Sequence, residues 1–486
     1  MSIDELVNNV RTGRTRAGSA AVHAADALDA AGRQLGAVLD VNRETLAQRI
    51  QTLESRLKAG EELPLAGVPV GIKDNIAVTG ERLSCGSRIL ETHRAPYNAH
   101  VIERLIAAGA LPVGRLNMDE FAMGSSTENS AFGPCKNPWD TTRTPGGSSG
   151  GSAAVVAAGC VPVALGSDTG GSIRQPAAFT GTVGLKPTYG RVSRFGLVAF
   201  GSSLDQIGPI ARSVADAARI YDVIAGRDQR DATSSAEAVE AALPGLDDSI
   251  AGMRIGIPAE YVSDALDPRI KARVDEAARH LEALGAKLVP VSLPHTKYAI
   301  PTYYIVATAE ASSNLARHDG IHQGVRAKDA NDLLACYLKN RGQGLGKEVQ
   351  RRILLGTFCL SSGYYEAYYD RAMRVRTLLA RDFDAAFSQA DVLLGATTPT
   401  LPFRLGEKTS DPLQMYLADI LTASANLAGV PALVVPAGTV LEDNRPLPVG
   451  LQLLGPAFSE ARLFRAGQAI ERAFKGPLTL PAGALA

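Results

Sequence analysis

Two glycine-rich loops near the middle of the chain constrain its fold more than any other feature. They are Pro145-Gly-Gly-Ser-Ser-Gly-Gly-Ser152 and Gly166-Ser-Asp-Thr-Gly-Gly-Ser-Ile-Arg-Gln-Pro176. The apolar run 153–165 between them predicts a helix and then a strand, whereas a flexible spacer would join polar segments. Glycines in such loops allow close backbone approach or positive φ angles. Taken alone, the pattern also fits two tight turns without chemistry.

The rest of the sequence alternates between helical and strand patterns. Ser2 and Glu5 form a capping box, and apolar residues recur at helical spacing up to Gly60, so residues 1–60 are expected to be N-terminal helices that pack on the core. Short β-rich apolar runs follow, with helical segments between them. These runs are 68–72, 161–166, 254–257, 287–291, 392–396, 432–437 and 449–454. This alternation predicts an α/β fold.

The sequence offers no clean domain boundary after residue 60. We expect one domain over 61–486, with its core at about 67–212 and an exposed polar connection at about 226–251. Strand patterns resume after that connection, so one sheet could span both halves. Near the end, Ser459 followed by apolar residues at helical spacing predicts a last amphipathic helix that covers the sheet.

Composition narrows the class of protein. Lys plus Arg and Asp plus Glu both number 50 among 486 residues, so the chain has no global basic field for a nucleic-acid backbone. The five cysteines are widely spaced and contain no C-x-x-C pair, which favours reduced thiols. No apolar run approaches the roughly 18 residues of a membrane span. A cytoplasmic protein without membrane contact is expected.

Several catalytic motifs compete for the glycine loops. No Gly-Lys-Ser or Gly-Lys-Thr follows a glycine loop, and no G-x-G-x-x-G follows a strand, which argues against Walker and Rossmann nucleotide sites. Gly146-Gly-Ser148-Ser-Gly150 fits the G-x-S-x-G pattern of α/β-hydrolases, but no downstream histidine lies in a context that suggests a triad.

Two short segments outside the loops imitate other sites. His318-Asp-Gly-Ile-His322 resembles H-E-x-x-H, but its glycine weakens the helix that a shared metal would need. Ser55-Arg-Leu-Lys58 fits S-x-x-K on a predicted amphipathic helix, without the other motifs of that enzyme class. Both segments are predicted to be structural.

Three motifs together resemble the amidase signature family. They are Gly71-Ile-Lys73-Asp-Asn75, Gly146-Gly-Ser148-Ser-Gly-Gly151 and Asp168-Thr-Gly-Gly-Ser172-Ile-Arg-Gln-Pro176. The lysine precedes the first serine by 75 residues and the second serine follows by 24, the spacings of that family. The resemblance implies a single large domain with a mixed central β-sheet covered by helices on both faces.

The same resemblance implies a Ser-cis-Ser-Lys triad. Ser172 would be the nucleophile, Ser148 the bridge in a non-proline cis peptide, and Lys73 the base. A lysine acts as a base only when neutral, so its pKa must fall by roughly three units from about 10.4, which burial can supply. Thr169, Gly170 and Gly171 would contribute backbone N–H groups to an oxyanion hole.

Further segments resemble the glutamine-hydrolysing subunits of tRNA-dependent amidotransferases. They are 117–124, 186–200, 351–357 and 361–365. This resemblance implies that Arg352 binds the α-carboxylate of glutamine and Asp419 its α-ammonium, with Tyr303 and the Met123-Gly124 backbone nearby. A zwitterionic amino acid needs both charges. Arg351 stays open as the alternative carboxylate ligand.

The implied assembly is a heterotrimer in which this chain joins the B and C subunits of the amidotransferase. The B subunit would use ATP and Mg²⁺, hold most of the tRNA and receive the ammonia, so that misacylated Glu-tRNA(Gln) becomes Gln-tRNA(Gln). Whether Asp-tRNA(Asn) is served instead or as well stays open. No metal or cofactor is implied for this chain. Two other functions stay open: a stand-alone amidase for small or peptide amides, and a non-catalytic scaffold.

Overall fold

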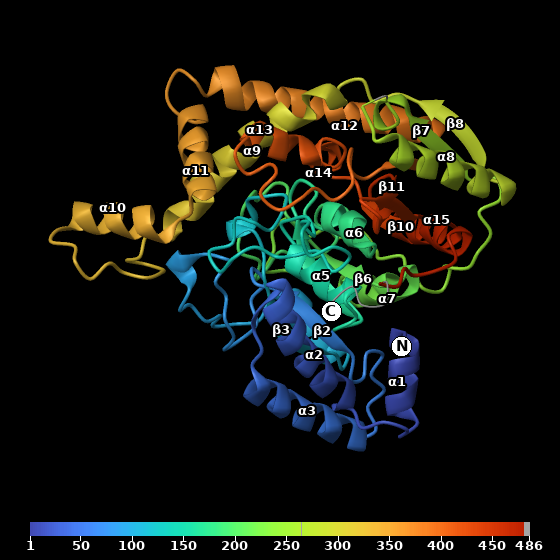
Figure 1. Ribbon diagram of the computed structural model, residues 1–486, viewed down its shortest axis with the longest axis horizontal. Helices are drawn as coiled ribbons and strands as arrows, with labels where there is room; N and C mark the ends of the chain where they lie inside the picture. Colours follow the sequence, from blue (N-terminus) through green and yellow to red (C-terminus); the bar gives the residue numbers. More distant parts are fainter. Residues whose placement is uncertain (264, 481–486) are drawn as a thin grey trace.

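The computed structural model describes residues 1–263 and 265–480, within which eleven strands form one mixed sheet (Figure 1). Along the sheet they follow the order β1-β3-β2-β4-β6-β5-β10-β11-β9-β7-β8. The strands are β1 (Val38–Asp40), β2 (Pro69–Lys73), β3 (Leu111–Leu116), β4 (Val163–Asp168), β5 (Val183–Lys186), β6 (Gln206–Ala211), β7 (Arg254–Pro258), β8 (Lys287–Val291), β9 (Val392–Ala396), β10 (Ala432–Glu442) and β11 (Arg445–Leu454). Every predicted strand is present, and the single mixed sheet of an α/β fold is confirmed.

Helices flank this sheet in two layers. The first contains α2 (Ser19–Leu35), α5 (Gly150–Ala157) and α6 (Arg174–Thr180), and the second α4 (His100–Ala107), α7 (Val214–Ile224) and α15 (Glu460–Ala473). The last helix begins directly after Ser459 and packs on β10, as its apolar spacing predicts. Besides these helices and those of a helical subdomain, the described residues form five further α-helices: α1 (Ile3–Arg11), α3 (Arg43–Lys58), α8 (Pro268–Ala283), α13 (Pro412–Tyr416) and α14 (Ala423–Ala428).

A helical subdomain lies over one side of the sheet. It consists of α9 (Ala299–Asn314), α10 (Leu333–Gly344), α11 (Lys347–Cys359) and α12 (Arg371–Gln389), and α10 projects from the body of the molecule (Figure 1). This subdomain has its own apolar cluster, separate from the large core around the sheet, and the cluster includes Met123 and Tyr303. Residues that are distant in sequence, such as Met123 and Tyr303, therefore lie together in the cluster of this subdomain.

The N-terminal segment differs in one respect from the helices expected there. The capping box of Ser2 and Glu5 is present at the start of α1. However, β1 pairs with β3 and forms an edge of the sheet, so this segment also contributes a strand. Three residues are too few to give a period-two pattern in the sequence. No helix among the described residues is long and apolar enough to cross a bilayer.

Candidate active site

The site forms where the carboxyl ends of two neighbouring strands meet. β2 and β4 are parallel partners, with Ile72 opposite Leu165, so Lys73 and Asp168 emerge at the same edge of the sheet. The two glycine loops begin there too: one precedes α5 and the other follows β4. In α/β proteins this edge of the sheet is the usual place for ligands. The topology thus brings the lysine to both serine loops.

Lys73 is fully buried, and its amine is surrounded by hydroxyl groups. Its Nζ lies 2.7 Å from Ser148 Oγ, 2.8 Å from Ser149 Oγ and 2.9 Å from Ser167 Oγ. Burial lowers the pKa of Lys73 to about 7, although buried carboxyl groups nearby, Asp119 first among them, act in the opposite direction. A neutral amine has two donors and one lone pair, so one of these hydroxyls can donate to it.

Ser148 lies in a tightly packed loop directly before α5. The Gly147–Ser148 peptide bond is cis, as the resemblance to the amidase signature family implies. Gly147 donates from its N–H to Gln175 Oε1 at 2.8 Å, and a Cβ at this glycine would lie 2.1 Å from Asp119 Oδ2. Only glycine fits there, which accounts for one of the conspicuous glycines of this loop.

Ser172 lies on the turn between β4 and α6, which a buried ion pair holds in place. Asp168 accepts a hydrogen bond from the N–H of Ile173 at 3.1 Å and pairs with Arg174 Nε at 3.0 Å. Although burial would raise it, the Arg174 guanidinium holds the pKa of Asp168 at about 2. Ser149 donates its N–H to the Ser172 carbonyl at 3.1 Å, so the two serine loops lie side by side.

Ser172 is the accessible member of the three predicted catalytic residues. Its exposed fraction is 7%, whereas Lys73 and Ser148 are at 0%. A nucleophile must reach the substrate, while a proton relay works best away from bulk water. The gradient of burial therefore suits the predicted order of roles, from Lys73 through Ser148 to Ser172.

The loop before Ser172 has free backbone donors. Within the part of the chain that the structure describes, the N–H groups of Thr169, Gly170 and Gly171 have no protein acceptor. The Thr169 hydroxyl donates to Asp205 Oδ1 at 2.7 Å, which fixes one end of the loop. Small residues are needed because a Cβ on Gly170 would lie 2.6 Å from Tyr303 Cζ. The geometry suits stabilisation of an oxyanion by backbone groups.

Asp419 brings an acidic group to this loop. It is 7% exposed, and burial raises the pKa of its carboxyl to about 7. Ser125 donates to its Oδ2, whereas its Oδ1 is buried without a hydrogen-bond partner among the described residues and would lie 3.2 Å from a Cβ on Gly171. An unpaired buried carboxylate oxygen next to the nucleophile loop suits a cationic ligand group.

Arg352 places a basic group in the helical subdomain, on α11. It is 2% exposed on α11, pairs with Glu348 Oε1 at 2.8 Å, and has the rings of Tyr304 and Tyr416 within 5.4 Å of its Cζ. Although burial opposes it, Tyr304 and Glu348 raise the pKa of Arg352, so the guanidinium is charged. The neighbouring Arg351 also pairs with Glu348, but its side chain is 46% exposed.

Met123 and Gly124 are buried in a segment with an unusual backbone. The preceding Phe121 and Ala122 have φ angles of 50° and 63°. Asn129 donates to the Met123 carbonyl at 3.3 Å, and a Cβ on Gly124 would lie 2.3 Å from Asp119 Cγ. Asp119 packs against this segment and also against the Ser148 loop. The Met123-Gly124 backbone, which is predicted to lie near the substrate, and the predicted catalytic loop therefore contact the same side chain.

Comparison with known proteins identifies the family of this chain. A family model described as Amidase matches residues 21–464. The chain belongs to the amidase family. This confirms the resemblance that the lysine and the two serine loops carry. Amidases of known structure share its fold: the peptide amidase from Stenotrophomonas maltophilia is 31% identical, with a TM-score of 0.82 over 99% of both chains.

The most similar relatives among those compared share a narrower description, the A subunit of glutamyl-tRNA(Gln) amidotransferase. The relative of this name from Anaeromyxobacter sp. (strain K) is 57% identical over 93% of this chain and 92% of the relative. The one from Carboxydothermus hydrogenoformans is 52% identical over 97% of both. The crystal structure of the same subunit from Thermotoga maritima is 41% identical, with a TM-score of 0.79 over 99% of this chain and 97% of the other.

Some residues of this candidate site are not identified by the sequence motifs. Ser149 and Ser167 bind Lys73 as closely as Ser148 does, and Asn75 donates to Ser167 Oγ at 2.9 Å. All three lie within or beside the motifs quoted above, so their proximity to these motifs in the sequence could have identified them. Glu348, the partner of Arg352, lies four residues before it on α11, the spacing of a helical ion pair.

The histidine segment 318–322 holds no metal-like arrangement. His318 is buried and stacks on Phe121 with ring centroids 5.1 Å apart, and burial lowers its pKa to about 4. His322 is exposed and instead bonds Asp319 at 2.7 Å. Among the described residues no group of histidine, cysteine or acidic side chains could hold a metal ion.

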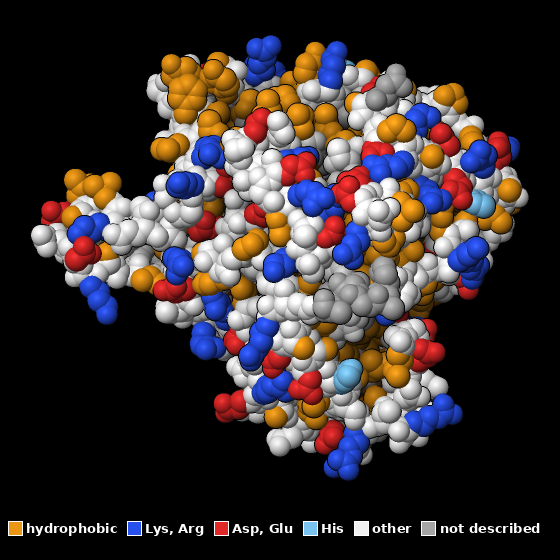
Figure 2. Space-filling model, viewed as in Figure 1, with side chains coloured by type: hydrophobic (Ala, Val, Ile, Leu, Met, Phe, Trp, Pro, Cys, Tyr) orange, Lys and Arg blue, Asp and Glu red, His pale blue; other side chains and the backbone are white. Residues whose placement is uncertain are grey.

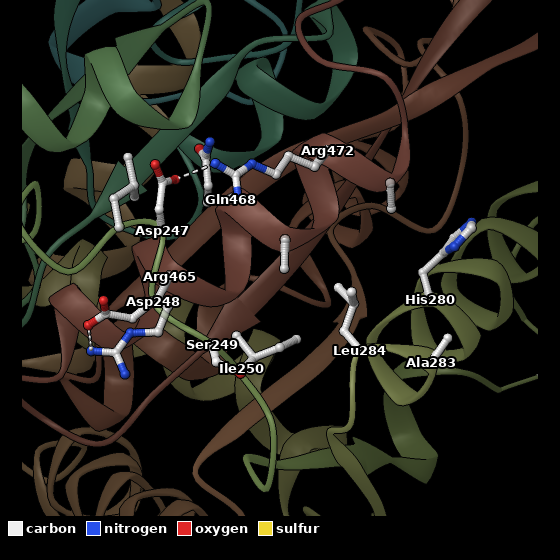
Figure 3. A pocket seen from close by; sticks show the side chains of 13 residues that line it. Asp247, Asp248, Ser249, Ile250, His280, Ala283, Leu284, Arg465, Gln468 and Arg472 are labelled. Carbon is white, nitrogen blue, oxygen red and sulfur yellow. Dashed lines mark hydrogen bonds and ion pairs between the residues drawn. The ribbon is translucent and has the colours of Figure 1, made fainter.

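A separate cavity lies away from the amidase site. It has a volume of about 420 Å³ and lies between α8, α15 and the connection around 246–250 (Figure 3). The pairs Asp247–Arg472 and Asp248–Arg465, at 2.5 and 3.7 Å, close its charged side. None of the predicted site residues lines it. The ion pairs already satisfy its charged groups, so we regard it as a surface groove between packed helices.

Proposed function

We propose that this chain is the glutamine-hydrolysing subunit of a tRNA-dependent amidotransferase. One observation carries the proposal: the buried, charged Arg352 lies on α11 of the helical subdomain, and the unpaired buried oxygen of Asp419 lies beside Gly171 of the Ser172 loop. Glutamine has an α-carboxylate and an α-ammonium, and it needs one partner for each. A simple amide needs neither. The names of the relatives above support the same assignment.

The reaction follows from the positions of the groups. Neutral Lys73 accepts a proton from Ser148, which accepts one from Ser172, and Ser172 Oγ attacks the carboxamide carbon of glutamine. The N–H groups of Thr169, Gly170 and Gly171 stabilise the oxyanion. The same relay returns the proton to the leaving nitrogen, so ammonia departs and a γ-glutamyl ester remains. A water molecule then attacks the ester carbonyl carbon through the same proton relay, which releases glutamate and regenerates free Ser172.

The ammonia would pass to the partner subunits. The B subunit would activate the tRNA-bound glutamate with ATP and Mg²⁺ and would hold most of the tRNA, and the C subunit would complete the heterotrimer in the cytoplasm. The balanced charge of this chain, 50 basic and 50 acidic residues, supports tRNA binding elsewhere in the assembly.

A stand-alone amidase is the second candidate. It is favoured by the similarity of the whole fold to the peptide amidase from Stenotrophomonas maltophilia. The two candidates share Lys73, Ser148 and Ser172, so they differ in substrate and in dependence on partners rather than in the chemical step.

A substrate series separates the two candidates. The kinetic constants kcat and KM are measured for L-glutamine, for glutaramic acid, which lacks the α-ammonium, for 4-aminobutanamide, which lacks the α-carboxylate, and for propionamide. The proposal predicts that each missing charge lowers kcat/KM by about 10- to 100-fold, the value of one charge-assisted hydrogen bond. Arg352→Gln should abolish the difference between glutamine and 4-aminobutanamide. Equal turnover of propionamide and glutamine by the wild type would favour the stand-alone amidase.

A further inference from the structure

The outer face of α11 and the segment after it expose an unusual amount of apolar surface. Leu354 is 70% exposed and Phe358 43%, and Leu355 is exposed beside them. The following segment adds Tyr364, Tyr365 and Tyr368. Figure 2 shows apolar side chains gathered at the corner where α11 meets α12. We call these six residues the α11 surface. Contiguous exposed apolar patches on soluble proteins often mark interaction sites.

The aromatic residues of the α11 surface pack against one another. The ring centroid of Phe358 lies 4.4 Å from that of Tyr364 and 5.7 Å from that of Tyr368. A π-helical turn, Glu366–Asp370, follows and presents Tyr368 beside them. Leu354 and Phe358 are four residues apart, so they share one face of α11. Rigid clusters of aromatic and large apolar side chains are typical of interface centres.

The opposite face of α11 reaches the proposed glutamine site. Val349, Arg352, Gly356 and Cys359 are its buried residues. Gly356 lies against α9, because a Cβ there would be 1.9 Å from the Thr308 carbonyl oxygen, and α9 also carries Tyr303. A partner bound to the outer face of α11 would therefore act on the helix that carries Arg352 and that packs closely on the helix of Tyr303.

The charges around the α11 surface indicate the kind of partner. Residues 326–376 contain ten Lys or Arg and five Asp or Glu, a net charge of +5 in a chain whose total is zero. The exposed ones closest in sequence are Lys347, Arg351, Arg371 and Arg374. Arg351 and Arg374 pair with Glu348 and Asp370, whereas Lys347 and Arg371 have no ion pair among the described residues. An acidic rim would complement them. Leucines gain nothing from stacking on bases, so the exposed Leu354 and Leu355 favour a protein with an apolar centre over an RNA.

We propose that the α11 surface is the docking site for a partner subunit of the amidotransferase, whose contact face is apolar with an acidic rim, and that docking there fixes Arg352 for glutamine binding. This inference rests on the proposed function. It assigns to the partner a second role besides accepting ammonia, because a partner seated on α11 stabilises the helix that holds the substrate carboxylate. Empty and occupied docking sites should then differ chiefly in KM for glutamine.

The test uses the full chain with the co-expressed B and C subunits. Leu354→Glu and Phe358→Glu are compared with the wild type and with Leu441→Glu, a matched control, since Leu441 is 68% exposed on the distant strand β10. Two quantities are measured: the Kd for the partner subunits, and kcat and KM for glutamine with and without them. Formation of the glutamyl adduct by each isolated variant reports that its fold and its chemistry are intact.

The expected result is a loss of at least 100-fold in affinity for the partner subunits in both α11 variants, with adduct formation unchanged and with the Leu441→Glu control within twofold of the wild type. The decrease in KM that the partner subunits cause should disappear in the same variants. Wild-type affinity in both α11 variants would overturn the docking site while leaving the proposed function intact.

Other outcomes overturn the inference differently. If the isolated wild type binds tRNA and the α11 variants do not, the α11 surface is an RNA-binding site and not a docking site for a protein. If the wild type self-associates through it, the occupant is a second copy of this chain. A wild type that neither binds the partner subunits nor forms a glutamyl adduct would overturn the proposed function, and the docking inference with it.

Discussion

Lys73 Nζ lies 2.7 Å from Ser148 Oγ, and neither side chain reaches solvent. Burial lowers the pKa of this lysine to about 7, so a large fraction of it is neutral at neutral pH. A base with a pKa near the working pH is the most effective kind.

We expect kcat for propionamide or glutamine to rise as the pH increases through about 7, because Lys73 must lose a proton before it can accept one. Lys73→Met should lower kcat by about 10²- to 10⁴-fold and remove the pH dependence. Initial rates between pH 5.5 and 9 measure both. A rate that falls as the pH rises through this range would exclude Lys73 as the base.

Ser148 and Ser149 offer a matched pair of variants, since both hydroxyls lie within 2.8 Å of Lys73 Nζ. Ser149 also donates to the Ser167 carbonyl, which marks it as a support of the lysine. Ser148→Ala should lower kcat by about 10²- to 10⁴-fold, as expected for a lost proton relay, and Ser149→Ala by less than 10-fold. Steady-state measurements of kcat for both variants test this. A larger loss of kcat in Ser149→Ala than in Ser148→Ala would assign the proton relay to Ser149.

Arg352→Gln should raise KM for glutamine by about 10- to 100-fold and leave kcat/KM for propionamide unchanged, since only glutamine has a carboxylate to bind. Arg351→Gln is the control: its side chain is exposed, and its effect should be within twofold. If Arg351→Gln produces the larger increase in KM, the carboxylate ligand is Arg351.

Asp419 should make glutamine binding sensitive to pH. Burial raises the pKa of its carboxyl to about 7, so the group loses its negative charge as the pH falls below that value. KM for glutamine should therefore rise below pH 7, whereas KM for propionamide should not. Asp419→Asn should raise KM at pH 8 and remove this dependence. An unchanged KM in the variant would remove Asp419 from the binding site.

The same carboxyl should lower stability at high pH. Between its ordinary pKa near 3.8 and about 7, the folded state keeps a proton that the unfolded state has released. The contribution of Asp419 to the free energy of unfolding therefore falls as the pH rises through this window. Asp419→Asn should raise the melting temperature at pH 8 more than at pH 4.5, in thermal scans at equal rates. A variant that is less stable than the wild type at pH 8 would contradict this.

Much of the fold could be predicted from apolar patterns, and the exceptions have physical reasons. The patterns did not reveal β3, β5 and β6, or the short β1. β3 and β6 contain both glycine and proline within buried strands, and β3 also contains the buried Arg115. β5 ends in the buried Lys186. Charged residues and turn formers within so short a run weaken the apolar signal by which the other strands were identified.

The site could be predicted in part, for a different reason. The serine loops and Lys73 were found because their spacing matches a known motif, and the structure joins them at one edge of the sheet. Ser149 and Ser167 were missed because their roles depend on contacts with Lys73, which is distant in sequence. Glu348 was missed although its spacing from Arg352 is that of a helical ion pair. Spacing along a chain cannot show that three hydroxyls surround one amine.

The measurement that tests the central claim most directly is intact mass after brief incubation with a glutamine analogue that has an electrophilic γ-carbon, followed by peptide mapping. Wild type, Ser172→Ala and Ser152→Ala are compared. Ser152 is a buried serine on α5, four residues after Ser148, and donates to the Leu165 carbonyl. We predict one adduct on Ser172 in the wild type and in Ser152→Ala, and none in Ser172→Ala. An adduct of equal yield in Ser172→Ala, or one that maps to another residue, would contradict the account.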